Sequence, residues 1–202
     1  MNADFKTNGK SIKTERLILR PFAESDLADF YEYASVEGVG ERAGWAHHKS
    51  IDESREILAR FIEEDKTFAI CLKESDKVIG SLGVEKYGSE DKLTEFDGYR
   101  GREIGFVLSK DYWGRGFMPE AVKAVMEYLF VELDYDFLIC GYYNFNEQSK
   151  KVQQKCGFVP YRALTMETRM GTVEEGTLNL AINPKKNIKF NFSHPETLIY
   201  EE

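Results

Sequence analysis

The stretch DYWGRGFMPEAV, residues 111–122, decides how the rest of the chain is interpreted. It follows an apolar run and contains two closely spaced glycines, after which Pro119 and Glu120 begin a predicted helix. Glycine lets the backbone approach a ligand closely, and the first turn of a helix exposes N–H groups that lack intrahelical partners. The helix dipole adds partial positive charge at the same place. The stretch therefore predicts either a plain tight turn or a site for an anion such as a phosphate.

Two familiar phosphate-binding motifs do not fit this stretch. No Gly-Lys-Ser/Thr follows, so it is not a P-loop, and the third residue after Gly116 is Pro119, so it is not the dinucleotide-binding G-x-G-x-x-G. An isolated G-x-G is by itself more typical of a turn between a strand and a helix. Arg115, between the glycines, would add a charge-assisted contact to an anion. Other segments of the chain are needed to choose between the two interpretations.

Periodicity and turn signals predict alternating strands and helices around this stretch. Residues 136–143, DFLICGYY, are almost continuously apolar, which is typical of a strand buried on both faces. The predicted elements are, in order, a strand at 16–22, a helix opened by residues 24–26, a helix capped by Ser50, strands at 67–73, 77–87 and 102–109, a helix through about residue 133, the strand at 136–143, a short helix ending at Gly157, and two closing strands. This order predicts a mixed α+β domain around one central sheet.

Composition narrows the class of protein. A chain of 202 residues, 42% of them hydrophobic, can bury the core of one domain. Its formal net charge of −8 disfavours nucleic acid as a partner and favours a cationic acceptor such as an amine. There is no apolar signal segment and no window of 18 uninterrupted apolar residues, so we expect a cytoplasmic protein without membrane contact. Cys71, Cys140 and Cys156 lack CxxC spacing, which indicates free thiols and no metal.

A second motif, NEQSKKVQQKCGF at residues 146–158, follows the buried strand. With it, the chain resembles the GNAT superfamily of acetyl-CoA-dependent N-acetyltransferases, and more narrowly the RimJ/RimL-like branch that acetylates protein N-termini. The resemblance also includes the following segments in the same order: TERLILRPF (14–22), HHKSIDES (47–54), EIGFVL (103–108) and YWGRGFMPEA (112–121). It implies a central, mostly antiparallel sheet of about seven strands flanked by helices. It also implies direct acetyl transfer in a ternary complex, with no covalent acyl-enzyme.

The resemblance assigns the coenzyme contacts to a strand and a loop. The backbone of the strand would bind the pantetheine arm and stabilise the thioester carbonyl, through Phe106, Val107 and Leu108. Main-chain N–H groups of the loop would bind the phosphates, at Gly114, Arg115, Gly116, Phe117 and Met118. The family usually has Gln or Arg where this chain has Asp111, which cannot donate a hydrogen bond to pyrophosphate. We therefore expect the main chain, with Arg115, to make the phosphate contacts.

Two further coenzyme contacts are implied beyond the buried strand. Asn146 matches the family's CoA-contacting asparagine. Lys151 is either a partner for a CoA phosphate or a solvated lysine.

Acetyl transfer to an amine also requires a base and a group that stabilises the leaving thiolate. The resemblance places the base at Glu103, acting through water, with Glu85 as the second candidate. Glu103 is about equally well explained as a surface carboxylate paired with Arg100 or Arg102. Ser149 matches the family's serine near the CoA sulfur, where it would donate a hydrogen bond; otherwise it only stabilises its helical turn.

The acceptor amine is not encoded in any motif. We expect specificity to reside in the loops at 35–50, which contains His47 and His48, and at 88–101. A protein N-terminal amine and a small amine both remain open. So do a coenzyme-binding sensor without turnover and a transferase for a longer acyl chain.

The sequence and the resemblance, which covers residues 12–183, together predict the division of the chain. Residues 1–11 would form a flexible leader, residues 12–183 the acetyltransferase domain, and residues 184–202 an extension that packs on the body or on a second subunit of a homodimer. The last expectation rests on apolar residues of the extension, which are Phe190, Phe192, Leu198, Ile199 and Tyr200.

Overall fold

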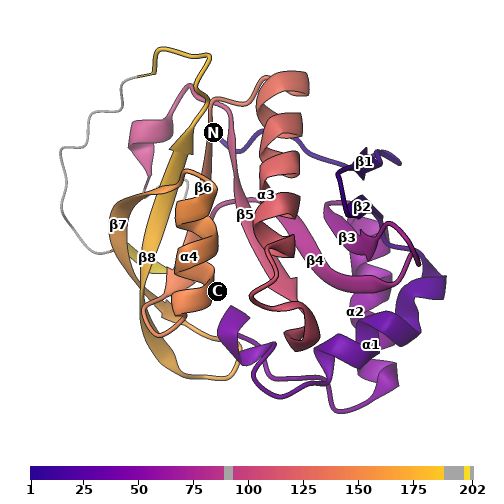
Figure 1. The fold of residues 1–202 in the computed structure, drawn as a ribbon. Coiled ribbons are helices and arrows are strands. Elements are labelled where there is room, and N and C mark those ends of the chain that lie inside the picture. The colour runs from indigo at the N-terminus through magenta and orange to yellow at the C-terminus, as the bar shows by residue number, and fades with distance from the viewer. Residues whose placement is uncertain (89–92, 189–197, 201–202) are drawn as a thin grey trace. The chain divides into compact units, whose positions relative to one another are not determined.

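The computed structural model describes residues 1–88, 93–188 and the backbone of 198–200 (Figure 1). Its contacts divide the chain into two compact units. Unit 1 comprises Met1–Asp4, Glu85–Ile104 and Met126–Glu202, and unit 2 comprises Phe5–Val84 and Gly105–Val125. Strand β5 (Gly101–Leu108) and helix α3 (Phe117–Glu127) each have residues in both units.

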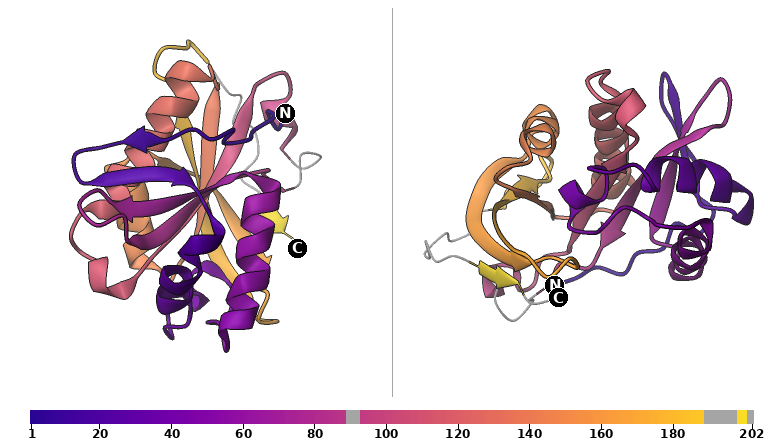
Figure 2. Two further views of the ribbon diagram at one scale, coloured as in Figure 1. Left: turned by 90° about the vertical axis from the view of Figure 1, so that its right-hand side faces the viewer. Right: turned by 90° about the horizontal axis from the view of Figure 1, so that it is seen from below.

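Unit 2 is an antiparallel sheet with two helices. Its strands follow the order β1-β2-β3-β4, after which comes β5, and the first three pairings are antiparallel. The elements are β1 (Ile12–Lys13), β2 (Leu17–Pro21), α1 (Leu27–Ala34), α2 (Ile51–Glu64), β3 (Thr67–Leu72) and β4 (Val78–Glu85). Ser50 caps α2 as predicted, because its side chain accepts a hydrogen bond from the Glu53 N–H. In the left-hand view of Figure 2, α1 and α2 lie side by side.

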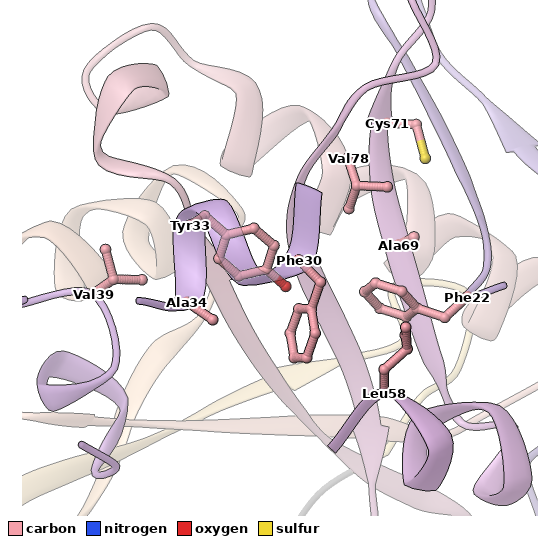
Figure 3. Close-up of a cluster of buried hydrophobic side chains, with 9 residues drawn as sticks. All are labelled: Phe22, Phe30, Tyr33, Ala34, Val39, Leu58, Ala69, Cys71 and Val78. Atoms are coloured by element: carbon pink, nitrogen blue, oxygen red, sulfur yellow. The ribbon is translucent and has the colours of Figure 1, made fainter. Parts of the chain in front are cut away.

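The core of unit 2 lies between these helices and strands β3 and β4. Figure 3 shows Phe30 of α1 and Leu58 of α2 directed toward Phe22 and Ala69. The rings of Phe22 and Phe30 meet edge to face with centroids 5.7 Å apart. The buried members of this cluster are Phe22, Phe30, Tyr33, Ala34, Val39, Leu58, Ala69, Cys71 and Val78.

Unit 1 combines two parallel strand pairings with two antiparallel ones. The first part of β5 pairs in parallel with β6, β6 pairs antiparallel with β8, β8 pairs antiparallel with β7, and β7 pairs in parallel with β9. The elements after α3 are β6 (Phe137–Tyr143), α4 (Glu147–Lys155), β7 (Val159–Glu167), β8 (Val173–Ile182) and β9 (Leu198–Tyr200). α4 contacts β6, as Figure 1 shows.

The core of unit 1 is built from β6, β8 and the segment before β5. Phe96 stacks on Phe137 with ring centroids 4.2 Å apart. The buried members of this cluster are Tyr87, Leu93, Phe96, Phe137, Ile139, Leu164, Leu178 and Leu180. Phe96 and Leu93 belong to the segment 88–101, which the sequence predicted to be a polar acceptor loop. The described part of this segment is a loop with a short 3-10 turn, but these two side chains are at most 1% exposed and belong to the core.

The predicted mostly antiparallel sheet flanked by helices is confirmed. The described residues form nine strands where about seven were expected, and the short β1 and β9 account for the difference. The predicted helix through residue 133 ends as α3 at Glu127 and continues as a π-helical turn, Tyr128–Glu132. No described helix is long and apolar enough to span a membrane.

The first residues of the chain differ from the expected flexible leader. Ala3, Phe5 and Thr7 are buried, and the Ala3 N–H donates to the carbonyl of Gly101 over 3.1 Å. Buried and exposed side chains alternate over residues 3–7. This alternation is too short to be recognised from the sequence as a periodic pattern. At the other end, the backbone of β9 pairs with β7, whereas Phe190 and Phe192 lie outside the described residues.

Candidate functional site

The loop before α3 has the backbone conformation that its glycines permit. Gly114 has φ +73° and Gly116 has φ +81°, in the left-handed region that other residues avoid. Helix α3 begins at Phe117, and its first turn closes when the Glu120 N–H donates to the carbonyl of Gly116. Pro119 has no N–H to donate.

The N–H groups of this loop are available to a ligand. In the described residues, none of the main-chain N–H groups of residues 114–118 donates a hydrogen bond to another protein group. Gly114, Arg115 and Gly116 are exposed, whereas the side chains of Phe117 and Met118 are buried and hold the start of the helix. The guanidinium of Arg115 lies over the rings of Tyr112 and Phe117. Unpaired donors at a helix N-terminus form an anion-binding arrangement.

Glu120 and Arg16 anchor the loop, and sequence reasoning gave neither of them a role. The Glu120 carboxylate accepts hydrogen bonds from the Thr14 hydroxyl and from the Arg16 N–H, and it forms an ion pair with the Arg16 guanidinium. Burial by itself would raise the pKa of Glu120, but the hydrogen bonds from Thr14 and Arg16 outweigh it, so the pKa is lowered.

Arg16 also contacts the loop directly. Its Nη1 donates to the carbonyl of Arg115 over 3.0 Å, and its guanidinium lies 4.3 Å from the Phe117 ring centroid. Its Nη2 lies 3.5 Å from where a Cβ on Gly116 would be. Arg16 therefore places a cation beside the loop. This chain has Asp111 where the family that it resembles usually has a basic or amide side chain. The only sequence signal for this was the position of Arg16 in the segment TERLILRPF.

The second part of β5 contains the three residues predicted to bind the pantetheine arm. Phe106 and Val107 are half-buried and Leu108 is buried. The carbonyl of Leu108 already accepts a hydrogen bond from the Trp113 indole N–H over 2.8 Å. One of the backbone groups expected to be open to a ligand is therefore occupied.

In unit 1, Glu103 is half-buried on β5, opposite Ile139 of β6. The parallel ladder between the two strands includes no pair beyond Glu103 and Ile139. The Glu103 Oε1 lies 3.8 Å from where a Cβ on Gly141 would be. Burial raises the pKa of the Cys140 thiol well above its ordinary value, and the negative charge of Glu103 adds to that effect.

The arginines proposed as structural partners of Glu103 make other contacts. The Nε of Arg102, a residue only 4% exposed, donates to the carbonyl of Ala3. The Arg100 guanidinium lies 5.4 Å from the Tyr135 ring centroid.

Ser149 and Asn146 lie at the start of α4. Asn146 is the N-cap, since its Oδ1 accepts a hydrogen bond from the Ser149 N–H over 3.1 Å. The Ser149 hydroxyl oxygen accepts from Nε2 of Gln153 over 3.1 Å, and the same Nε2 donates to the carbonyl of Gly141 over 3.0 Å. Gly141 thus lies near Glu103 and is linked to Ser149 through Gln153. Lys151 is exposed, which fits both interpretations of that residue.

Glu41 organises the predicted acceptor loop at 35–50. Its carboxylate accepts hydrogen bonds from the N–H groups of Gly38 and His47 and contacts Nδ1 of His47. Burial opposes ionisation, but the bonds from His47 outweigh it and lower the pKa of Glu41 to about 2. His48 is buried, and its Nδ1 lies 2.7 Å from the Ser54 hydroxyl. In the described residues, no three His, Cys, Asp or Glu side chains form a group that could hold a metal ion.

Comparison with known proteins identifies the family. The model of the acetyltransferase (GNAT) domain matches residues 16–159. A Bacillus subtilis strain 168 protein named as an uncharacterized N-acetyltransferase, YnaD, is 29% identical over 154 residues, which cover 72% of this chain and 81% of YnaD.

Two solved structures illustrate the shared fold. A ribosomal-protein-S5-alanine acetyltransferase from Vibrio fischeri matches with a TM-score of 0.66 and 21% identity, over 87% of this chain and 97% of that one. A spermidine N-acetyltransferase from Vibrio cholerae, in complex with CoA and spermine, matches with a TM-score of 0.68 and 17% identity, over 85% of this chain and 98% of that one. At these identities the structures establish the fold, whereas the domain match covers most of the chain and establishes the family. The chain therefore belongs to the GNAT family of acetyltransferases.

Proposed function

We propose that this acetyltransferase moves an acetyl group from acetyl-CoA to a primary amine, with a protein N-terminal amine as the first acceptor to test. The observation that carries the proposal is the loop at 114–118, whose main-chain N–H groups have no protein partner among the described residues at the start of α3. These groups, with Arg115, would bind the coenzyme diphosphate. Phe106, Val107 and Asn146 would contact the rest of the coenzyme, with Lys151 available to a phosphate.

Glu103 and Ser149 supply the chemistry in this proposal. Glu103 accepts a proton from the ammonium group, directly or through water, and frees the nitrogen lone pair. The amine nitrogen then bonds to the thioester carbonyl carbon, the carbon–sulfur bond breaks, and the sulfur leaves as thiolate. The nitrogen releases its second proton to solvent and becomes the neutral amide. A hydrogen bond from the Ser149 hydroxyl stabilises that thiolate. The negative net charge favours the approach of a cationic acceptor.

Proteins with this fold are named for different acceptors. One solved structure with this fold is named as a ribosomal-protein-S5-alanine acetyltransferase, and another as a spermidine N-acetyltransferase. The RimJ/RimL-like segments of the sequence favour the protein N-terminus. A small amine such as a polyamine is the second candidate, favoured by the net charge of −8.

A panel of acceptors tests the proposal. The protein is incubated with acetyl-CoA and with peptides of varied N-terminal residue, the same peptides with blocked N-termini, polyamines, aminoglycosides or amino acids. Released CoA thiol and product mass are measured. Acetylation of free but not blocked peptide N-termini supports the proposal, and turnover of polyamine alone supports the second candidate. Tight CoA binding without turnover of any amine would point to a coenzyme sensor.

The role of Glu103 has its own test. Glu103→Gln removes the base but preserves the shape of the side chain. We expect CoA affinity by calorimetry to change little while the transfer rate falls by about 10²-fold or more, the usual contribution of a general base. Glu85→Gln tests the second candidate base in the same way, and should slow transfer only if Glu85 is the base. An unchanged rate for Glu103→Gln between pH 6 and 9 would show that Glu103 is not the base.

A further inference from the structure

Gln153 is a fully buried polar residue on α4 whose side-chain amide is surrounded by hydrogen-bond partners. Its exposed fraction is 0%, which is unusual for glutamine. Its Nε2 donates to the Gly141 carbonyl and to the Ser149 hydroxyl oxygen, and its Oε1 accepts from Nδ2 of Asn179 over 2.8 Å. The amide therefore joins the end of β6, the middle of β8 and the first turn of α4.

The Gly141 carbonyl determines which way the Gln153 amide faces. A carbonyl oxygen can only accept, so the NH₂ end of the amide must face Gly141. The oxygen end then faces Asn179, which must present its own NH₂ group. With this orientation, the two hydrogens of the Gln153 NH₂ are directed to Gly141 and Ser149.

This orientation leaves Ser149 only one role toward Gln153. Its hydroxyl oxygen is an acceptor in that bond, so its own hydrogen stays available for another acceptor. In the described residues, the Ser149 hydroxyl donates to no protein group. A serine on a helix often loses this hydrogen to a carbonyl of the preceding turn. The bond from Gln153 instead holds the Ser149 hydroxyl oxygen and directs the hydroxyl hydrogen away from Gln153.

Asn179 holds the far end of this arrangement. It is 2% exposed and lies opposite Cys140 in the antiparallel pairing of β6 and β8. Its Oδ1 is buried without a hydrogen-bond partner in the described residues, an arrangement that destabilises the fold. An apolar side chain at this position would avoid that cost, but it would leave the Gln153 oxygen without its donor.

We propose that Gln153, held by Asn179, is a positioning residue that directs the Ser149 hydroxyl hydrogen toward the sulfur of the coenzyme. The proposal rests on the proposed function, because it assumes that Ser149 is the group beside the leaving thiolate. Gln153 contacts no reacting atom. It acts by making Ser149 a hydrogen-bond donor to sulfur, so that it stabilises the thiolate more than the thioester.

The test measures how much the coenzyme sulfur contributes to binding affinity, and not how stable the fold is. Calorimetry gives the affinities for CoA and for desulfo-CoA, which lacks the thiol, at about pH 9, where much of a free thiol is ionised. We expect the wild-type protein to prefer CoA by about tenfold, as one hydrogen bond to a charged group predicts. Ser149→Ala should remove this preference. Gln153→Glu has nearly the same shape but cannot donate both hydrogen bonds, and it should remove the preference although Ser149 is intact.

The controls separate positioning from folding. Gln154→Glu makes the same change at the neighbouring exposed position and should keep the preference. If Gln153→Glu does not fold, Gln153→Met, which is uncharged and of similar length, takes its place with the same expected loss. The double variant Ser149→Ala/Gln153→Met should lose no more than Ser149→Ala alone.

The outcomes also separate this proposal from the proposed function. A Gln153 variant that keeps the full preference for CoA over desulfo-CoA overturns the positioning role, even if acetyl transfer is observed. A wild-type protein without any such preference overturns it as well. A preference that depends on Gln153 in a protein that acetylates no amine would support the positioning role and contradict the proposed function. In an active protein, Gln153→Glu should lower kcat and leave KM for acetyl-CoA nearly unchanged.

Discussion

Gly80 on β4 allows a close approach to the part of β5 that we propose binds the coenzyme. A Cβ on Gly80 would lie 2.4 Å from the carbonyl oxygen of Val107 and 3.1 Å from the Cα of Leu108. Gly80→Ala should therefore displace backbone rather than a flexible side chain. To restore an ordinary van der Waals contact, the Val107 carbonyl must move by about 1 Å.

This displacement sets the expected magnitudes. Overpacking of this kind costs about 1–3 kcal/mol. A loss of about 2 kcal/mol lowers Tm by roughly 4–8 °C for a chain of this size. Since Val107 belongs to the strand proposed to bind the pantetheine arm, a shift of about 1 Å should also reduce the transfer rate by about 10²-fold. Thermal unfolding measures the first effect, and the acetyl-CoA assay measures the second.

Gly105→Ala is the matched control for stability. Gly105 lies on β5, the strand that contains Val107, and it is exposed. A Cβ at this position would have nothing within 4 Å. Its Tm should equal or slightly exceed that of the wild-type protein, because alanine restricts the unfolded chain. If Gly80→Ala unfolds at the wild-type temperature and transfers acetyl at the wild-type rate, the close approach of β4 to β5 has no importance for the site.

Three further predictions concern the loop and two ionisable residues. Gly116→Glu should abolish CoA binding, because it puts bulk and negative charge at the proposed diphosphate site. Gly171→Glu, also at positive φ with open space around it, is the control. Micromolar affinity for CoA retained by Gly116→Glu in calorimetry would contradict the prediction. Glu120→Gln should cost about 1–2 kcal/mol at pH 7 through weakened bonds to charged groups. Because the native pKa of Glu120 lies below its ordinary value of 4.5, this contribution is present above pH 4.5 and disappears as the pH falls through the native pKa, so denaturant unfolding of variant and wild type should converge in acid. Burial lowers the pKa of His48, so its folded form resists protonation and stability should fall as the pH drops below about 6.5. His48→Gln should flatten that slope, and an unchanged slope would show that His48 does not cause it.

Local sequence determined most of the elements and the loop. The glycines at 114 and 116 have the positive φ values that a tight approach to a helix requires, and Ser50 and Asn146 cap helices where residues of their type are expected. These features depend on residues a few positions apart, whose backbone preferences and hydrogen bonds are the same in any fold. The buried strand at 136–143 was predicted for a similar reason, since burial on both faces removes polar alternation.

The leader and the loop at 88–101 were harder to predict because their burial depends on distant partners. Phe96 is apolar in a polar segment, and only its stacking on Phe137 shows that it belongs to the core. Ala3 is similar, since its N–H bonds to Gly101 across almost half of the chain.

The candidate site depends on contacts that no local pattern contains. Arg16 and Glu120 are 104 positions apart, and Gln153 and Asn179 are 26 apart on a helix and a strand. By itself, the sequence determined where helices begin, where strands run and which loop presents its N–H groups. Only the tertiary structure decided which cation lies beside that loop and which amide holds the serine hydroxyl. The physical reason is that strand order and helix packing bring these side chains together, and a hydrogen bond is specified by the position of its partner rather than by the residues next to it in the chain.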